Sequence, residues 1–135
     1  MAIKLNEIVN ALFVVDDPGS IDSVSKEFLS LGILPVATDN EYDAAQYVLG
    51  GQNRILLLDV ALPKNKGLDI LKHIRLKEKE KNIVGIPTII FSEFVDEKIK
   101  NQARELGALD CIINPKDTLE KIAEKIKEAD SKSKC

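Results

Sequence analysis

The sequence predicts an α/β fold with five helices and a five-stranded, doubly wound parallel sheet. Two observations lead to this prediction. Five short apolar runs lack polar alternation, which is typical of strands that are buried on both faces of a sheet. Segments with the apolar spacing of amphipathic helices lie between the runs. Strands that alternate with helices imply right-handed crossovers, and therefore a parallel sheet.

The predicted strands end at polar residues. They cover residues 11–15, 33–37, 54–58, 88–91 and 111–113. Pro35 interrupts the second run. Because proline cannot donate a hydrogen bond to a neighbouring strand, we expect this strand to lie near an edge of the sheet.

The predicted helices are marked by five apolar stripes. These stripes are Ile21, Val24, Phe28 and Leu31; Ala44, Ala45, Val48 and Leu49; Leu68, Leu71 and Ile74; Ile99, Ala103 and Leu106; and Leu119, Ile122 and Ile126. Each stripe predicts one helix. The third stripe precedes a charged segment, 77–81, in which Glu78 and Glu80 alternate with lysines. We expect that segment to be a solvated helix face.

The length of 135 residues fits one domain, with a core from about residue 11 to 129 and a polar tail from 130 to 135. No linker interrupts the pattern, so we expect a single domain without a separate output domain. The formal net charge of −3 argues against direct binding of nucleic acid, which needs a basic surface. No apolar run approaches the roughly 20 residues of a membrane span. The first ten residues also lack the apolar core of a signal peptide. We therefore expect a cytoplasmic location.

The chemistry is predicted at one edge of the sheet, because ligands of open α/β sheets bind outside the carboxyl ends of the strands. Asp16 and Asp17 follow the first strand, Asp59 the third, Ser92 the fourth and Asn114 the fifth. Three carboxylates at one edge repel one another unless a cation compensates, and Mg²⁺ prefers such oxygen ligands. A carboxylate beside Mg²⁺ can attack a phosphoryl donor. Each residue alone is more typical of a turn or a helix cap; their convergence favours a site.

Four segments in this order carry a resemblance to a known family. They are residues 12–17, residues 57–63 with Gly67 following, residues 87–92 and residues 107–110. In these segments the chain resembles the receiver domain of two-component response regulators, the family of the chemotaxis protein CheY. The resemblance extends from about residue 11 to 129 and implies the CheY-like variant of the flavodoxin-like fold.

The resemblance implies a role for each site residue. Asp59 would be the phosphoacceptor. Asp17 and Asp59 would bind Mg²⁺ together with the backbone carbonyl of Ala61, and Asp16 would hold a metal-bound water. Ser92 would be the switch hydroxyl that meets the phosphoryl group.

The resemblance also implies partners. A histidine kinase or a phosphotransfer protein would phosphorylate the domain. The face formed by the fourth helix, the fifth strand and the fifth helix would bind a downstream protein. We expect a monomer or weak dimer with no direct contact to nucleic acid or membrane.

Several residues depart from the family pattern. Asn114 stands where the family has a lysine, and Cys111 stands at the aromatic switch position. Lys116 follows beyond Pro115 and is expected to point elsewhere. Glu93 follows Ser92, where the family usually has a small residue.

These departures leave a second interpretation open: an interaction module, or pseudo-receiver, that works without phosphorylation. Ala61 and Phe94 occupy positions that often orient the attacking water in relatives, so we expect self-hydrolysis of the phosphoryl group to be slow. An enzyme of the haloacid dehalogenase type would need an aspartate at Ala61. We therefore expect no enzyme beyond slow autodephosphorylation.

Overall fold

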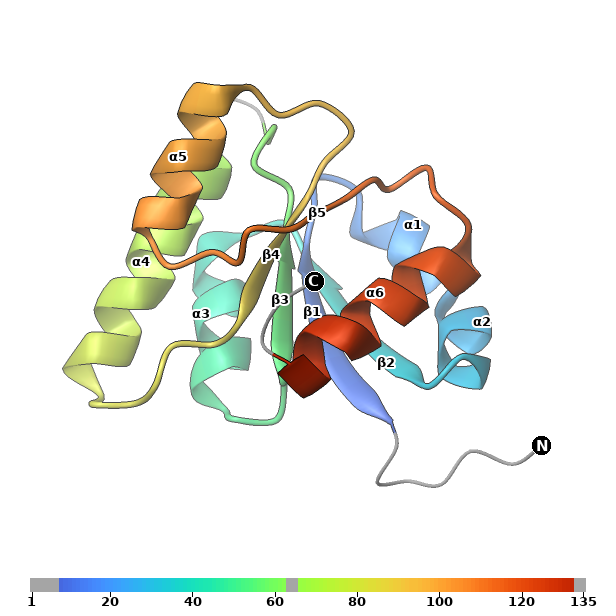
Figure 1. Ribbon diagram of the computed structural model, residues 1–135. Helices are drawn as coiled ribbons and strands as arrows, with labels where there is room; N and C mark the ends of the chain where they lie inside the picture. Colours follow the sequence, from blue (N-terminus) through green and yellow to red (C-terminus); the bar gives the residue numbers. More distant parts are fainter. Residues whose placement is uncertain (1–7, 63–65, 133–135) are drawn as a thin grey trace.

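The computed structural model describes residues 8–62 and 66–132, which form a central sheet with helices on both sides (Figure 1). The elements, in chain order, are β1 (Val9–Val14), α1 (Pro18–Asp22), α2 (Ser25–Ser30), β2 (Ile33–Thr38), α3 (Glu41–Leu49), β3 (Ile55–Leu58), α4 (Lys66–Glu80), β4 (Thr88–Phe91), α5 (Glu97–Glu105), β5 (Ile112–Ile113) and α6 (Leu119–Lys132). The α/β prediction is confirmed, and all five predicted strands are present.

The five strands are parallel and lie in the order β2-β1-β3-β4-β5. This is a doubly wound order in which the chain direction across the sheet reverses between β1 and β3. β2 lies at an edge, as Pro35 predicts. A ligand site is expected outside the carboxyl ends of β1 and β3, because the connections diverge there.

Both faces of the sheet are buried. In β1, Ala11 and Phe13 face a core that includes residues of α1, α2 and α6. Leu12 and Val14 face the other core, which includes residues of α3, α4 and α5. The Phe13 ring also lies 5.5 Å from the ring of Phe28 in α2, centroid to centroid. This double burial explains why the strands read as continuous apolar runs.

The first predicted helix is wrong in one respect, because two short helices replace it. The Ser20 hydroxyl donates to the carbonyl of Asp17 at 2.7 Å, and the Ser23 hydroxyl donates to the carbonyl of Ser20 at 2.9 Å. Local bonds of this kind compete with a continuous helix. The described residues therefore contain six helices rather than five. Ile21 of α1 and Phe28 of α2 still face the same core, so the layer is unchanged.

The predicted polar tail is partly helical. α6 continues to Lys132, and the carboxylate of Asp130 forms a 2.9 Å ion pair with Arg54. Residues 133–135 of the predicted tail lie outside the described residues, as does residue 63 of the segment 57–63. No helix of the described ranges combines the length and the apolar character needed to cross a bilayer.

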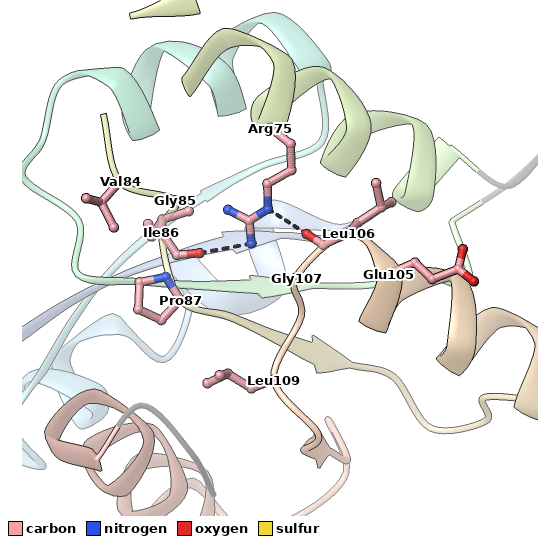
Figure 2. Close-up of a pocket in the computed structure, with 9 residues that line it drawn as sticks. All are labelled: Arg75, Val84, Gly85, Ile86, Pro87, Glu105, Leu106, Gly107 and Leu109. Carbon is pink, nitrogen blue, oxygen red and sulfur yellow. Dashed lines mark hydrogen bonds between the residues drawn. The ribbon is translucent and has the colours of Figure 1, made fainter. Parts of the chain in front are cut away.

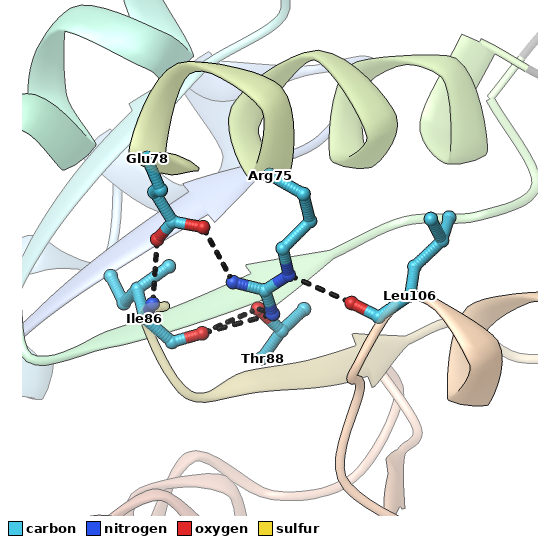
Figure 3. Close-up of polar contacts among 5 residues, drawn as sticks. All are labelled: Arg75, Glu78, Ile86, Thr88 and Leu106. Carbon is cyan, nitrogen blue, oxygen red and sulfur yellow. Dashed lines mark hydrogen bonds and ion pairs between the residues drawn. The ribbon is translucent and has the colours of Figure 1, made fainter. Parts of the chain in front are cut away.

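The charged end of α4 was expected to be solvated, and this is wrong for Glu78, whose side chain is 3% exposed. The Arg75 Nη1 atom lies 2.9 Å from Glu78 Oε1, and the backbone N–H of Ile86 donates to Glu78 Oε2 at 2.6 Å (Figure 3). Arg75 also donates to the carbonyls of Leu106 and Ile86 and to the Thr88 hydroxyl. The pair thus ties α4 to the segment that leads into β4 and to the end of α5.

Candidate functional site

Asp59 follows β3 directly, and the backbone holds it in place. Its N–H donates to the carbonyl of Val14 at 2.9 Å, which continues the β1–β3 pairing by one residue. Its Oδ1 atom accepts the N–H of Ala61 at 2.9 Å. The carboxylate is therefore oriented by the turn that follows it.

A cavity of about 320 Å³ lies at the carboxyl ends of the strands. It is lined by Asp16, Asp59, Ala61, Ser92, Glu93, Phe94 and Pro115. The structure thus brings together Asp16 from beyond β1, Asp59 and Ala61 from beyond β3, and Ser92 from beyond β4. The order of the strands placed Asp16, Asp59 and Ser92 at one edge, and the resemblance added Ala61; the four residues share one cavity.

The pKa of Asp59 responds to burial and to the negative charge of Asp16. Burial is the main cause that raises the pKa of Asp59 above its ordinary value, and the negative charge of Asp16 raises it further. The hydrogen bond from Ala61 acts in the opposite direction. A bound cation would relieve this repulsion. Two carboxylates with a nearby backbone carbonyl are hard oxygen donors, and such a donor set fits Mg²⁺.

Asp17 is placed differently from Asp16. Like Asp16 it is exposed, but it is the N-cap residue of α1 and is not among the residues that line the cavity. Its backbone carbonyl accepts the N–H and the hydroxyl of Ser20. Across residues 8–62 and 66–132, no three His, Cys, Asp or Glu side chains are clustered closely enough to hold a metal ion. Two of the three expected carboxylates therefore share the cavity.

Ser92 and Asn114, the two remaining predicted site residues, differ from each other in placement. Ser92 is buried, and its hydroxyl donates to the carbonyl of Phe94 at 3.3 Å. Asn114 does not line the cavity, whereas its neighbour Pro115 does. The Asn114 side-chain oxygen accepts the backbone N–H of Lys116 at 2.9 Å, so this side chain closes a turn.

One contact at the mouth of the cavity was missed from the sequence. Lys116 Nζ lies 3.1 Å from Glu93 Oε1, although the sequence indicated that Lys116 points elsewhere. Both residues lie in loops that follow the carboxyl ends of neighbouring strands, β4 and β5. That shared edge was the only sequence signal that could have paired them.

A larger cavity, of about 690 Å³, lies at the opposite end of β4 (Figure 2). It is lined by Arg75, Val84, Gly85, Ile86, Pro87, Glu105, Leu106, Gly107 and Leu109. Arg75 is already engaged by Glu78 and by protein carbonyls and a hydroxyl. The smaller cavity is therefore the better candidate, because it gathers the carboxylates of Asp16 and Asp59 at the ligand-binding end of the sheet.

The comparisons with known proteins identify the family of this chain. Residues 12–127 match the family model described as "Response regulator receiver domain". The chain belongs to the family of response regulator receiver domains. The resemblance inferred from the four segments is therefore confirmed, and so is the CheY-like fold.

Relatives and solved structures extend this result. The receiver domain is 30% identical over 115 residues to the transcriptional regulatory protein CpxR of Klebsiella pneumoniae, which covers 85% of this chain and 47% of CpxR. It superposes on the chemotaxis protein CheY4 of Vibrio cholerae with a TM-score of 0.72 at 16% identity, covering 90% of this chain and 98% of CheY4. It superposes on the beryllofluoride-activated NtrC receiver domain with a TM-score of 0.63 at 22% identity, covering 89% and 94% of the two chains. The chain spans about half the length of the curated relatives it matches.

Cys111, which the sequence resemblance places at the aromatic switch position, lies just before β5. Cys111 is 8% exposed and belongs to the core that also contains Phe13 and Phe91. The side chain at this position therefore lies in the core.

Proposed function

We propose that this receiver domain accepts a phosphoryl group on Asp59 from a phosphohistidine donor, and that it signals through a change in partner binding. One observation carries the proposal: Asp16, Asp59, Ala61 and Ser92, contributed by three strand ends, line the same cavity. Family membership supports it, because receiver domains belong to two-component response regulators. CpxR is a transcriptional regulatory protein, and this role is not carried over to this chain.

Asp59 would act as the nucleophile. Its carboxylate oxygen attacks the phosphorus atom, the phosphorus–nitrogen bond to the donor imidazole breaks, and the electron pair of that bond leaves with the imidazole. The N–H of Ala61 holds Oδ1 of Asp59 at 2.9 Å, which leaves the other oxygen for attack. Positioning of this kind supplies most of the catalysis in phosphoryl transfer.

A divalent cation, Mg²⁺, would neutralise charge on the transferred phosphoryl group. Asp59 and the backbone carbonyl of Ala61 are the ligands we propose, with Asp16 acting through a water. Asp17 completes the proposed set, although its side chain is not part of the cavity wall. Its position one residue after Asp16 and at the exposed start of α1 leaves it close to the site along the chain.

Ser92 would respond to the phosphoryl group on Asp59. Its hydroxyl rests on the carbonyl of Phe94 at 3.3 Å, a long bond that costs little to exchange. Donation to a phosphoryl oxygen on Asp59 would pull the β4–α5 loop toward the cavity. The partner face we propose consists of α5, β5 and α6, which are the fourth helix, fifth strand and fifth helix of the sequence prediction. A histidine kinase or phosphotransfer protein would be the donor, in the cytoplasm, and the domain would act as a monomer or weak dimer.

The test is covalent labelling of Asp59. The protein is incubated with acetyl phosphate and Mg²⁺, and its intact mass is measured. Beryllofluoride binding is followed in parallel by NMR. We expect one phosphoryl mass in the wild type and none in Asp59→Asn. Asp39→Asn is the matched control, because Asp39 also follows the end of a strand but is exposed and lies outside the cavity. Labelling that survives Asp59→Asn would contradict the proposal.

The second candidate is an interaction module that works without phosphorylation. The closed turn of Asn114 favours it, because its side-chain oxygen is used by the N–H of Lys116 and it lies outside the cavity wall. A wild-type protein that neither gains mass nor binds beryllofluoride would favour this candidate. In either case we propose no enzymatic activity beyond slow loss of the phosphoryl group.

A further inference from the structure

The cavity of this receiver domain has acidic walls, and the side chain of Lys116 lies at its mouth. Asp16, Asp59 and Glu93 line it, and none of the lining residues that the structure describes is basic. Lys116 reaches the wall from outside, with Nζ 3.1 Å from Glu93 Oε1. Of the ion pairs found among the described residues, this one alone joins a basic side chain to the cavity wall.

The turn after β5 sets the position of Lys116. The Asn114 side-chain oxygen accepts the Lys116 N–H at 2.9 Å, and the Asn114 carbonyl accepts the N–H of Asp117 at 3.0 Å. Between them, Pro115 forms part of the cavity wall. The backbone of Lys116 is therefore anchored next to the cavity, while its long side chain remains 75% exposed.

The charge balance at this mouth changes when Asp59 is modified. A phosphoryl group adds a charge of about −1.5 to −2 and three acceptor oxygens. An exposed ion pair such as Lys116–Glu93 is weak, because water screens it and the lysine side chain loses freedom in forming it. A more concentrated negative charge inside the cavity would compete well with the single carboxylate of Glu93.

We propose that Lys116 is the cation that binds the phosphoryl group on Asp59, and that Glu93 holds it at the mouth until that group arrives. This inference rests on the proposed function. Lys116 would leave Glu93 and turn inward, which makes Asn114 a turn-forming residue rather than a phosphate ligand. The movement would also release Glu93, which lies at the start of the loop from β4 to α5. The conformation of that loop would therefore change when the phosphoryl group arrives on Asp59.

The experiment measures beryllofluoride affinity by NMR titration with Mg²⁺ present, together with the initial rate of labelling by acetyl phosphate. We expect Lys116→Gln to weaken beryllofluoride binding by about tenfold and Lys116→Arg to restore it to within about twofold. Glu93→Gln should strengthen binding, because it releases Lys116 and removes a negative charge. Lys121→Gln is the matched control, since it removes an exposed lysine at the same end that pairs with Asp117 rather than with the cavity wall.

The outcomes separate this inference from the proposed function. Wild-type binding with equal affinities for Lys116→Gln and Lys121→Gln would overturn the role of Lys116 and leave Asp59 as the phosphoacceptor. Wild-type protein that fails to bind beryllofluoride or to be labelled would overturn both. Thermal unfolding of each variant shows that the fold is retained, and we expect it to be retained because Lys116 is exposed.

Discussion

Gly67, in the first turn of α4, packs directly against the backbone of Asp59. A Cβ atom added at Gly67 would lie 2.7 Å from the Cα atom of Val60 and would clash with the carbonyl oxygen of Asp59. Only glycine allows this approach, since backbone atoms cannot move aside as a flexible side chain can. The start of α4 therefore supports the turn that orients the Asp59 carboxylate.

Gly67→Ala should therefore affect both stability and the site. We expect a loss of about 1–3 kcal/mol in the free energy of unfolding, because overpacking against backbone forces the helix outward. Urea unfolding followed by circular dichroism measures this loss. Gly50→Ala is the control, since Gly50 has a φ of −67° and its nearest contact would be an ordinary 3.4 Å. Equal stability of the two variants would contradict the packing argument.

Asp16→Asn should lower the pKa of Asp59 in metal-free protein. The negative charge of Asp16 raises that pKa, so its removal favours the carboxylate, while burial keeps the pKa above its ordinary value. The titration of the Asp59 carboxyl carbon by NMR, with a chelator present, measures the change. In the wild type, the Asp59 carboxyl group binds its proton more tightly in the folded protein than in the unfolded chain, because folding raises its pKa. Asp59 therefore reduces stability at high pH, and this cost disappears as the pH falls through its folded pKa. A pKa that is the same in both proteins would argue against a shared site.

Ala61→Asn should shorten the lifetime of the phosphorylated protein. Ala61 is exposed and lines the cavity, but its methyl group cannot orient an attacking water. An amide there could do so, and we expect hydrolysis to become about tenfold faster, equivalent to about 1.4 kcal/mol of barrier. The decay of the phosphorylated mass after removal of acetyl phosphate gives the rate. An unchanged rate in Ala61→Asn would count against this role for the position.

Arg75→Met should destabilise the fold strongly without touching the cavity at Asp59. It would leave the buried carboxylate of Glu78 with the N–H of Ile86 but without its ion-pair partner, and removing one member of a buried ion pair costs about 3–5 kcal/mol. Lys77→Met is the control, because Lys77 and Glu80 are exposed and 3.5 Å apart; a loss below about 1 kcal/mol is expected. Chemical denaturation measures the free energy of unfolding of both variants. Similar losses in the two would refute the stabilising role of Arg75 beside Glu78.

Much of the fold could be predicted because burial on two faces leaves a direct trace in the sequence. The runs that became β1, β3 and β4 are apolar at successive positions, since each residue meets one of the two cores. The split between α1 and α2 escaped prediction, because the stripe from Ile21 to Leu31 reports only which face is buried. The hydroxyls of Ser20 and Ser23 donate to backbone carbonyls in that segment, and the apolar stripe carries no sign of these local bonds.

The site was predicted in part for the same reason. Parallel strands place their carboxyl ends at one edge, so Asp16, Asp59 and Ser92 had to be near one another once the strands were assigned. Asp17 was expected with them, but the turn into α1 leaves it outside the cavity wall. Glu78 was expected in water, and its burial depends on Arg75 and on a loop eight residues further along the chain.

The sequence by itself determined the order of the strands and helices along the chain, the two-sided burial of the strands and the edge at which the acidic residues gather. These properties follow from periodicity and from the polarity of strand ends, which are local. Only the tertiary structure decided that Asn114 closes a turn and that Lys116 meets Glu93 across the cavity mouth. Such contacts depend on loop backbone geometry and on which distant loops adjoin, and neither is encoded in the spacing of residue types.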